Sequence, residues 1–124
     1  MLKRLCAFIA MLSVLAFAQA LGNYTGTWTG ASGSGGKIKL TFNGEGLQTA
    51  SFTLQDQEVK AKPGSFKADG ETVTFTFDYE VEGNPLRSRM QGTITGKTMK
   101  GKYESVPAGG GAAVDEGTWE VTQQ

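Results

Sequence analysis

Aromatic side chains that also carry a hydrogen-bonding group are the residues of this sequence best suited to recognise a ligand. Tyr24, Tyr79, Tyr103 and Trp119 each stand on the apolar side of a run in which apolar and polar residues alternate. A buried phenol or indole N–H needs a hydrogen-bond partner, and such groups are favoured where one end of the side chain is apolar and the other is wet. Their chemistry is that of a binding pocket. The predicted pocket residues are Tyr79, Tyr103, Met90, Phe77, Tyr24 and Trp119.

The sequence offers little for catalysis. It contains no histidine, which excludes the imidazole general base, the His-bearing nucleophile pairs and the His-bearing zinc sites. In the clearest alternating runs every carboxylate falls on the polar side, so no inward pair of acids is expected. Asp115 and Glu116 are adjacent, but calcium takes about six to eight oxygen ligands, and we interpret this pair as part of a solvated loop. We predict a protein that is not an enzyme, with no catalytic residue, metal site or cofactor.

Residues 1–20 have the three parts of a secretory signal peptide. Two basic residues open the chain, an apolar run follows over residues 5–17, and residues 18–20 (Ala-Gln-Ala) form a small-x-small cleavage site. The apolar run is shorter than the roughly 20 residues that span a bilayer, which argues against a membrane anchor. We therefore predict export to the periplasm or the exterior, no stable membrane insertion after cleavage, and a single domain over residues 21–124.

The charge balance and the cysteine content narrow the class further. The chain has 12 basic and 12 acidic residues, and two of the basic ones lie in the leader, so the exported domain is slightly acidic. A nucleic-acid-binding protein would carry a basic face, and we expect no nucleic-acid partner. The one cysteine, Cys6, also lies in the leader, so the exported domain cannot form a disulfide.

Strict alternation over residues 71–82 predicts a long strand with one buried face. The run over residues 86–95 alternates in the same way, and a two-residue turn at Gly83-Asn84 would join the two strands as a hairpin. The facing pairs in that register are Phe77 with Met90, Val73 with Ile94, Phe75 with Gly92, Glu80 with Arg87, and Asp78 with Arg89. Both the apolar residues and the charges would then pair across the strands.

A second turn, at Gly96-Lys97, predicts the next strand. It sets Met90 opposite Tyr103 and Gly92 opposite Gly101. The missing side chains at the two glycines leave space for an aromatic ring, which the predicted register assigns to Phe75.

The remaining strands alternate less regularly, over residues 24–28, 37–42, 50–54, 59–68 and 117–121. Pro63-Gly64 interrupts one of them, either as a bulge within a single strand or as a turn between two short strands. A closed antiparallel meander needs an even number of strands, so we favour the bulge. The predicted fold is all-β, an eight-stranded antiparallel up-and-down meander closed into a small barrel. Nine strands or an open sandwich is the alternative.

The first strand carries the motif Gly26-x-Trp28. An eight-stranded meander that opens in this way resembles the calycin-like group of lipocalins, avidins and fatty-acid-binding proteins, closest in style to lipocalin-like domains that bacteria export. The following Gly33-x-x-Gly36 is similar to the opening of avidins, but Gly30 stands where avidins have a ligand-binding Asn, so biotin is not expected. The resemblance also implies that Trp28 closes one end of the barrel.

Two functions follow from this reading. The resemblance implies a small apolar ligand in the barrel mouth, and the apolar, aromatic set of inward residues fits that role. The interior of an eight-stranded barrel is, however, just wide enough for side chains to fill. The alternative is therefore a filled barrel that works through its surface, as a protease inhibitor or an adhesion or assembly module. Its contact regions would be the glycine-rich loops 30–36 and 106–116.

Overall fold

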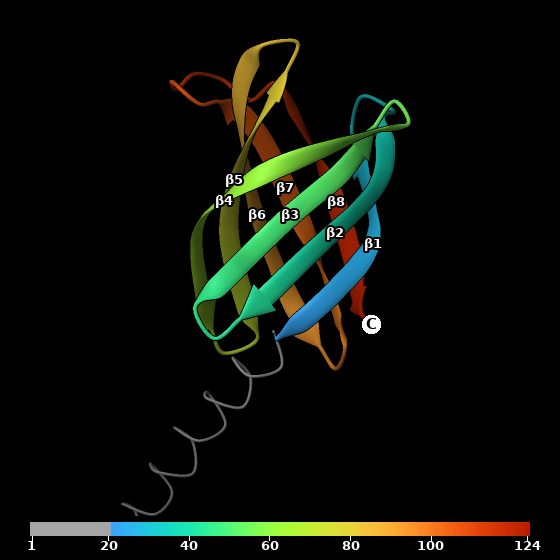
Figure 1. Ribbon diagram of the computed structural model, residues 1–124, viewed down its shortest axis with the longest axis vertical. Coiled ribbons are helices and arrows are strands. Elements are labelled where there is room, and N and C mark those ends of the chain that lie inside the picture. Colours follow the sequence, from blue (N-terminus) through green and yellow to red (C-terminus); the bar gives the residue numbers. More distant parts are fainter. Residues whose placement is uncertain (1–20) are drawn as a thin grey trace, which may run out of the picture.

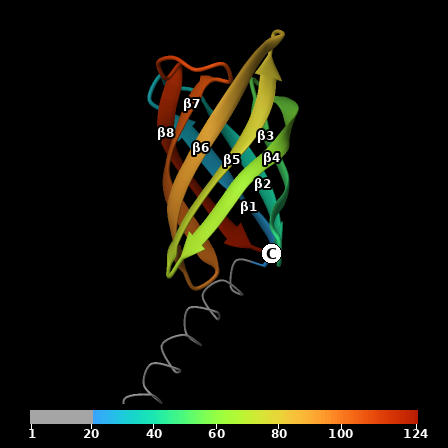
Figure 2. The same cartoon turned by 90° about the vertical axis from the view of Figure 1, so that its left-hand side faces the viewer.

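A computed structural model describes residues 21–124, which form an eight-stranded antiparallel β-barrel (Figure 1 and Figure 2). The strands are β1 (Gly22–Gly30), β2 (Gly35–Asn43), β3 (Gly46–Leu54), β4 (Gln57–Asp69), β5 (Thr72–Val81), β6 (Asn84–Thr95), β7 (Thr98–Pro107) and β8 (Asp115–Gln123). Each strand pairs with its neighbours in sequence, and β8 returns to pair with β1, which confirms the predicted all-β closed meander. The predicted signal peptide, residues 1–20, lies outside the described residues.

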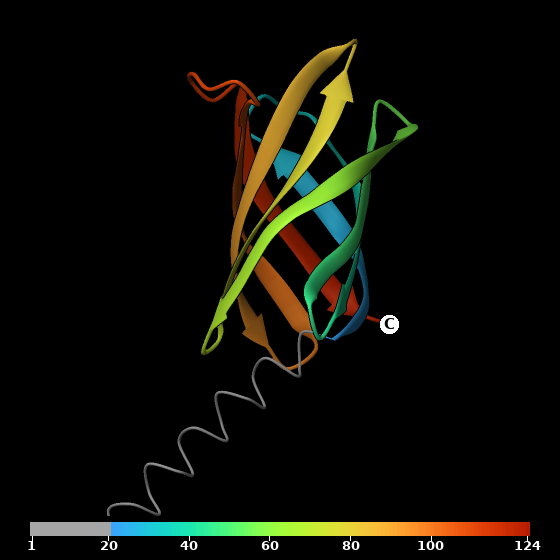
Figure 3. The same cartoon turned by 60° about the vertical axis from the view of Figure 1, so that its left-hand side comes forward.

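The two ends of the barrel differ (Figure 1 and Figure 3). The end we call the base carries three short turns, at residues 44–45, 70–71 and 96–97, together with the C-terminus. The end we call the mouth carries the connections at residues 31–34, 55–56, 82–83 and 108–114. The two glycine-rich connections are shorter than predicted, because strand pairing continues to Gly30 and Pro107 and resumes at Gly35 and Asp115. No helix in residues 21–124 has the length and apolarity needed to cross a membrane.

The β5–β6 hairpin turns one residue earlier than predicted. Val81 lies opposite Asn84, and the turn residues Glu82 and Gly83 have φ angles of 53° and 82°. Positive φ at both central residues defines the type I′ turn, whose twist matches that of the flanking strands. The predicted Gly83-Asn84 turn is therefore wrong.

Moving the turn by one residue shifts the register by two. The observed pairs are Phe75 with Met90, Val73 with Gly92, Phe77 with Ser88, Glu80 with Pro85, Asp78 with Arg87, and Thr76 with Arg89, in place of those predicted. Arg87 makes two hydrogen bonds to the Asp78 carboxylate, at 2.8 and 3.2 Å, and Arg89 bonds Glu104 instead. Because a shift of two keeps every side chain on its own face, the predicted inward set survives the error.

The predicted β6–β7 register is confirmed, with Met90 opposite Tyr103 and Gly92 opposite Gly101. The ring that occupies the space at Gly92 belongs to Trp119 and not to Phe75. A Cβ atom at Gly92 would lie 2.6 Å from Cζ2 of Trp119 and 2.8 Å from the carbonyl oxygen of Lys100. The absent side chain therefore gives the indole its place in the interior.

The predicted bulge in β4 is also confirmed. Pro63 lies opposite Phe77 and Phe66 opposite Phe75, so β4 has one residue more than β5 over this stretch. The backbone N–H of Ser65 donates to Oγ1 of Thr76 at 2.9 Å, which gives a partner to a group that the bulge removes from the strand ladder. The strand continues through the bulge, and the count stays at eight.

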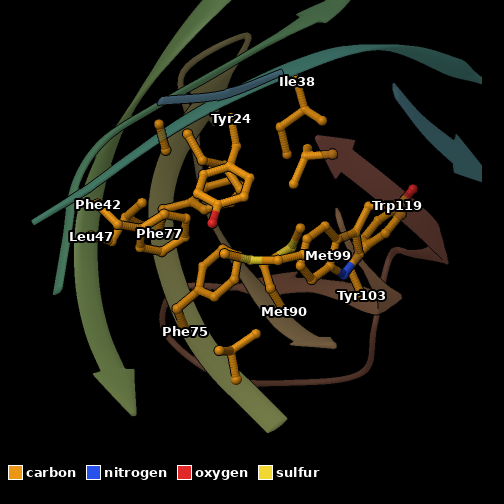
Figure 4. Close-up of a cluster of buried hydrophobic side chains, with 14 of the residues drawn as sticks. Tyr24, Ile38, Phe42, Leu47, Phe75, Phe77, Met90, Met99, Tyr103 and Trp119 are labelled. Atoms are coloured by element: carbon orange, nitrogen blue, oxygen red, sulfur yellow. The ribbon is translucent and has the colours of Figure 1, made fainter. Parts of the chain in front are cut away.

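Large buried side chains from all around the barrel pack together in its interior (Figure 4). Tyr24, Phe42, Phe75 and Trp119 form a series of edge-to-face contacts with ring centroids 5.5 to 5.7 Å apart. All four are at most 3% exposed. The base half of the barrel is a packed core that holds the strands in register.

We expect Gly92→Ala to destabilise the barrel by about 1–3 kcal/mol, because the added methyl group meets the Trp119 ring and a backbone carbonyl, neither of which can move freely. Urea unfolding followed by tryptophan fluorescence measures the effect. The control is Gly44→Ala in the β2–β3 turn, where a Cβ atom would meet nothing within 4 Å. Equal unfolding midpoints for the two variants would contradict the packing described here.

We expect Glu82→Gly to stabilise the barrel by up to about 1 kcal/mol, because glycine adopts the left-handed φ of this turn without the cost paid by other residues. The sign of the change tests the register. If the turn were at residues 83–84, Glu82 would be a strand residue and glycine would destabilise by about 0.5–1 kcal/mol. Thermal and urea unfolding of the wild type and this variant distinguish the two.

Candidate functional site

The mouth half of the barrel contains a cavity of about 330 Å³. Ligand pockets typically measure about 300–1,000 Å³, so this one suits a small molecule. Its wall is mainly apolar and aromatic, with several oxygens. The lining residues are Trp28, Ser32, Ser34, Ile38, Phe52, Leu54, Gln55, Phe77, Tyr79, Val81, Leu86, Ser88, Met90, Tyr103, Ser105, Val114 and Asp115.

The cavity lies where two small residues replace large ones on the inner face. Ser88 of β6 and Ser105 of β7 face each other across the strand pair, and both are buried. Towards the base, the next inward positions of these strands carry Met90 and Tyr103. Because the inward side chains of the two strands change from large to small towards the mouth, empty space remains in that half of the barrel.

The structure brings four of the six predicted pocket residues together. Phe77, Tyr79, Met90 and Tyr103 all line the cavity. Phe52 of β3, two strands away from β5, contacts Tyr79 edge to face, with ring centroids 4.9 Å apart. Aromatic faces and edges therefore make up much of the wall.

The other two predicted residues, Tyr24 and Trp119, are not in the cavity wall. Tyr24 is fully buried in the base, against Phe42. Trp119 packs on Phe75, and its indole N–H donates to the carbonyl oxygen of Lys102 at 3.0 Å. Both belong to the packed core.

Trp28 is a residue of the cavity wall that was not predicted to be one. It was expected to close one end of the barrel, but it lines the cavity, and its indole N–H donates to the carbonyl oxygen of Thr53 at 3.0 Å. The reason is its place near the end of β1, from which the chain enters the mouth connection at residues 31–34. Its ring also contacts Phe52 and Tyr103 edge to face.

Hydroxyl groups and one carboxylate form a polar layer at the mouth. The Tyr79 hydroxyl donates to Oγ of Ser105, and the Tyr103 hydroxyl donates to Oδ2 of Asp115, both at 2.8 Å. Burial raises the pKa of both phenols, and the Asp115 carboxylate raises that of Tyr103 further. Both side chains are therefore neutral hydrogen-bond donors at physiological pH.

Asp115, Ser88 and Ser105 are the site residues that the sequence reading missed. Asp115 was interpreted as part of a solvated loop, which is wrong, because it is the first residue of β8 and its side chain is partly buried in the cavity wall. The alternation itself would have identified it, since Asp115 stands two residues before the inward position Gly117. Ser88 and Ser105 are likewise two residues from Met90 and Tyr103.

A second hollow, of about 980 Å³, lies on the outer face of the barrel over β4 to β8 and is open to solvent. Its polar wall mixes charges of both signs, with Lys67, Arg89 and Lys102 beside Glu104 and Glu116. Solvated side chains of mixed charge do not select one ligand, so the mouth cavity is the better candidate. Among the described residues, no group of three or more acidic, histidine or cysteine side chains could hold a metal ion.

No family model matches the chain, and no curated protein or solved structure shows significant similarity to it.

We expect Asp115→Asn to lower the pKa of Tyr103, because the variant removes the negative charge that favours the protonated phenol, while burial keeps the pKa above its ordinary value. Ultraviolet absorbance during alkaline titration measures it, and Tyr103→Phe assigns the transition. The control is Glu116→Gln, which changes the exposed neighbouring residue and should leave the pKa of Tyr103 unchanged. An unchanged pKa in Asp115→Asn would contradict the hydrogen bond.

The raised pKa of Tyr103 also predicts how the stability of the folded protein changes with pH. The folded state holds the Tyr103 proton more tightly than the unfolded chain, where the pKa is about 10. This contribution to stability is therefore complete below about pH 10 and is lost as the pH rises through the folded pKa. The Asp115→Asn variant should therefore lose less stability than the wild type as the pH rises above about 10.

Proposed function

We propose that the protein is an exported, non-catalytic barrel that binds a small, mainly apolar ligand in its mouth cavity. The single observation that supports this is the cavity of about 330 Å³, with an aromatic wall and a layer of oxygens at its opening. Pockets for small molecules combine these two features, since the apolar wall gives affinity and a few polar groups give orientation.

Architecture adds a weaker line of support. The closed eight-stranded meander and Gly26-x-Trp28 on β1 are features shared with lipocalins, avidins and fatty-acid-binding proteins. We propose a relationship to that calycin-like group, and to its exported bacterial lipocalin-like members in particular. Fold alone does not identify a ligand, so the proposal depends on the cavity.

The cavity size sets the scale of the ligand. The cavity lies near the lower end of the range of ligand pockets, about 300–1,000 Å³, so we take a compact ligand of roughly eleven non-hydrogen atoms as the scale for probes. At roughly 0.5 kcal/mol per atom, such a ligand would bind with a dissociation constant of tens of micromolar. Binding experiments therefore need ligand concentrations up to the millimolar range.

We expect the neutral probe 4-phenylbutan-1-ol to bind the purified protein and to shift amide NMR signals of the mouth residues. Ser88→Leu places a larger side chain in the cavity and should weaken binding at least about tenfold. Met99→Leu, a conservative change in the fully buried base, is the matched control and should leave binding unchanged. Absence of any shift at 1 mM probe (about ten times the expected dissociation constant or more) in a folded wild-type protein would contradict the proposal.

A second candidate is a protein partner bound by the mouth loops. Each loop is tied to a neighbouring strand. The Ala31 N–H donates to the Glu116 carbonyl oxygen of β8 at 2.7 Å, and the Val114 N–H donates to the Ser105 carbonyl oxygen of β7 at 2.8 Å. Val114 is 60% exposed, as an apolar contact residue would be. A folded protein that takes up no apolar probe would favour this candidate.

A further inference from the structure

The wall of the mouth cavity contains an acidic side chain but no basic one. Among the described residues that line it, Asp115 is the only acid, and no lysine or arginine is present. The two arginines of β6 are engaged on the outer face, where Arg87 bonds Asp78 and Arg89 bonds Glu104. A ligand that enters the mouth therefore meets a carboxylate with no cation beside it in the cavity wall.

The Asp115 carboxylate is held in place by its surroundings. Oδ2 accepts the Tyr103 hydroxyl at 2.8 Å, and Oδ1 lies 3.5 Å from Oγ of Ser32. Oδ2 would also lie only 2.8 Å from a Cβ atom built on Gly30, so the absence of a side chain there makes room for the carboxylate. A carboxylate has about four acceptor sites, and these contacts leave some of them open.

Three of the hydroxyl protons in the mouth are already used within the protein. Tyr103 donates to Asp115, Tyr79 donates to Ser105, and Ser88 donates to the sulfur of Met90 at 3.4 Å. The oxygens of these groups remain able to accept. These oxygens and the Asp115 carboxylate are acceptors, which matches a ligand that brings its own protons.

We propose that the natural ligand is an organic amine: a protonated ammonium group on an apolar, aryl or alkyl body of about ten carbons. This rests on the proposed function. The ammonium group lies at Asp115 and offers three donors to the acceptors around it. The rings of Trp28 and Tyr103 also line the cavity, and the face of an aromatic ring attracts a cation. The apolar body occupies the cavity among Phe52, Phe77 and Met90.

Three probes that share one body test the proposal: 4-phenylbutylamine, 4-phenylbutan-1-ol and 4-phenylbutanoate, each titrated into the purified protein at pH 7 and followed by calorimetry. The amine is expected to bind about tenfold or more tightly than the alcohol, and the carboxylate more weakly than both. Asp115→Asn should reduce the amine to the affinity of the alcohol. The control Glu116→Gln removes the same charge from the exposed neighbouring residue and should keep the preference for the amine.

The outcomes separate this inference from the proposed function. Equal binding of the three probes, or an amine preference that persists in Asp115→Asn, overturns the amine assignment and leaves apolar binding standing. If none of the probes binds, both proposals fail. The far-ultraviolet circular dichroism and thermal unfolding of Asp115→Asn, compared with those of the wild type, verify that the variant is folded.

Discussion

The pairing of β8 with β1 is the constraint on which the rest of this structure depends. It runs over seven residue pairs, from Tyr24 with Gln123 to Gly30 with Gly117, and it leaves no strand of the sheet with an unpaired edge. Closure also sets the width of the interior. With eight strands the inside holds one layer of side chains and little else, so any cavity must come from a local reduction in side-chain size.

That reduction is found at one end only. The base is filled by Tyr24, Phe42, Phe75 and Trp119, whose rings contact one another edge to face. At the mouth, the serines of β6 and β7 take the place of such rings, and the hydroxyl groups of Tyr79 and Tyr103 are bonded to Ser105 and Asp115. Stability and recognition are therefore divided along the barrel axis. The packed base holds the strands, and the mouth is free to carry a site.

The alternation of residues predicted the faces of the strands well and their alignment less well. In the β5–β6 hairpin the register is wrong by two, because the positive φ of Glu82 places a type I′ turn one residue earlier than glycine alone suggested. Phe77 and Tyr79 still point inward, since an even shift preserves the face. The β6–β7 register was predicted correctly because Gly96 marks the turn, and the β4 bulge because closure with an even number of strands favours a bulge at Pro63-Gly64 over a turn.

By itself the sequence determined that the domain is all-β and which side chains point inward, because these follow from a local period of two. It favoured eight strands over nine only through the even number that a closed antiparallel meander needs. Only the tertiary structure decided where each inward residue lies along the barrel axis, between the base and the mouth. Tyr24 and Tyr103 have the same local pattern, yet one is in the core and the other in the cavity wall. This position along the axis depends on the summed registers of all eight strand pairs and on the closure of the barrel. For the same reason only the fold brought Asp115 to Tyr103 and the mouth.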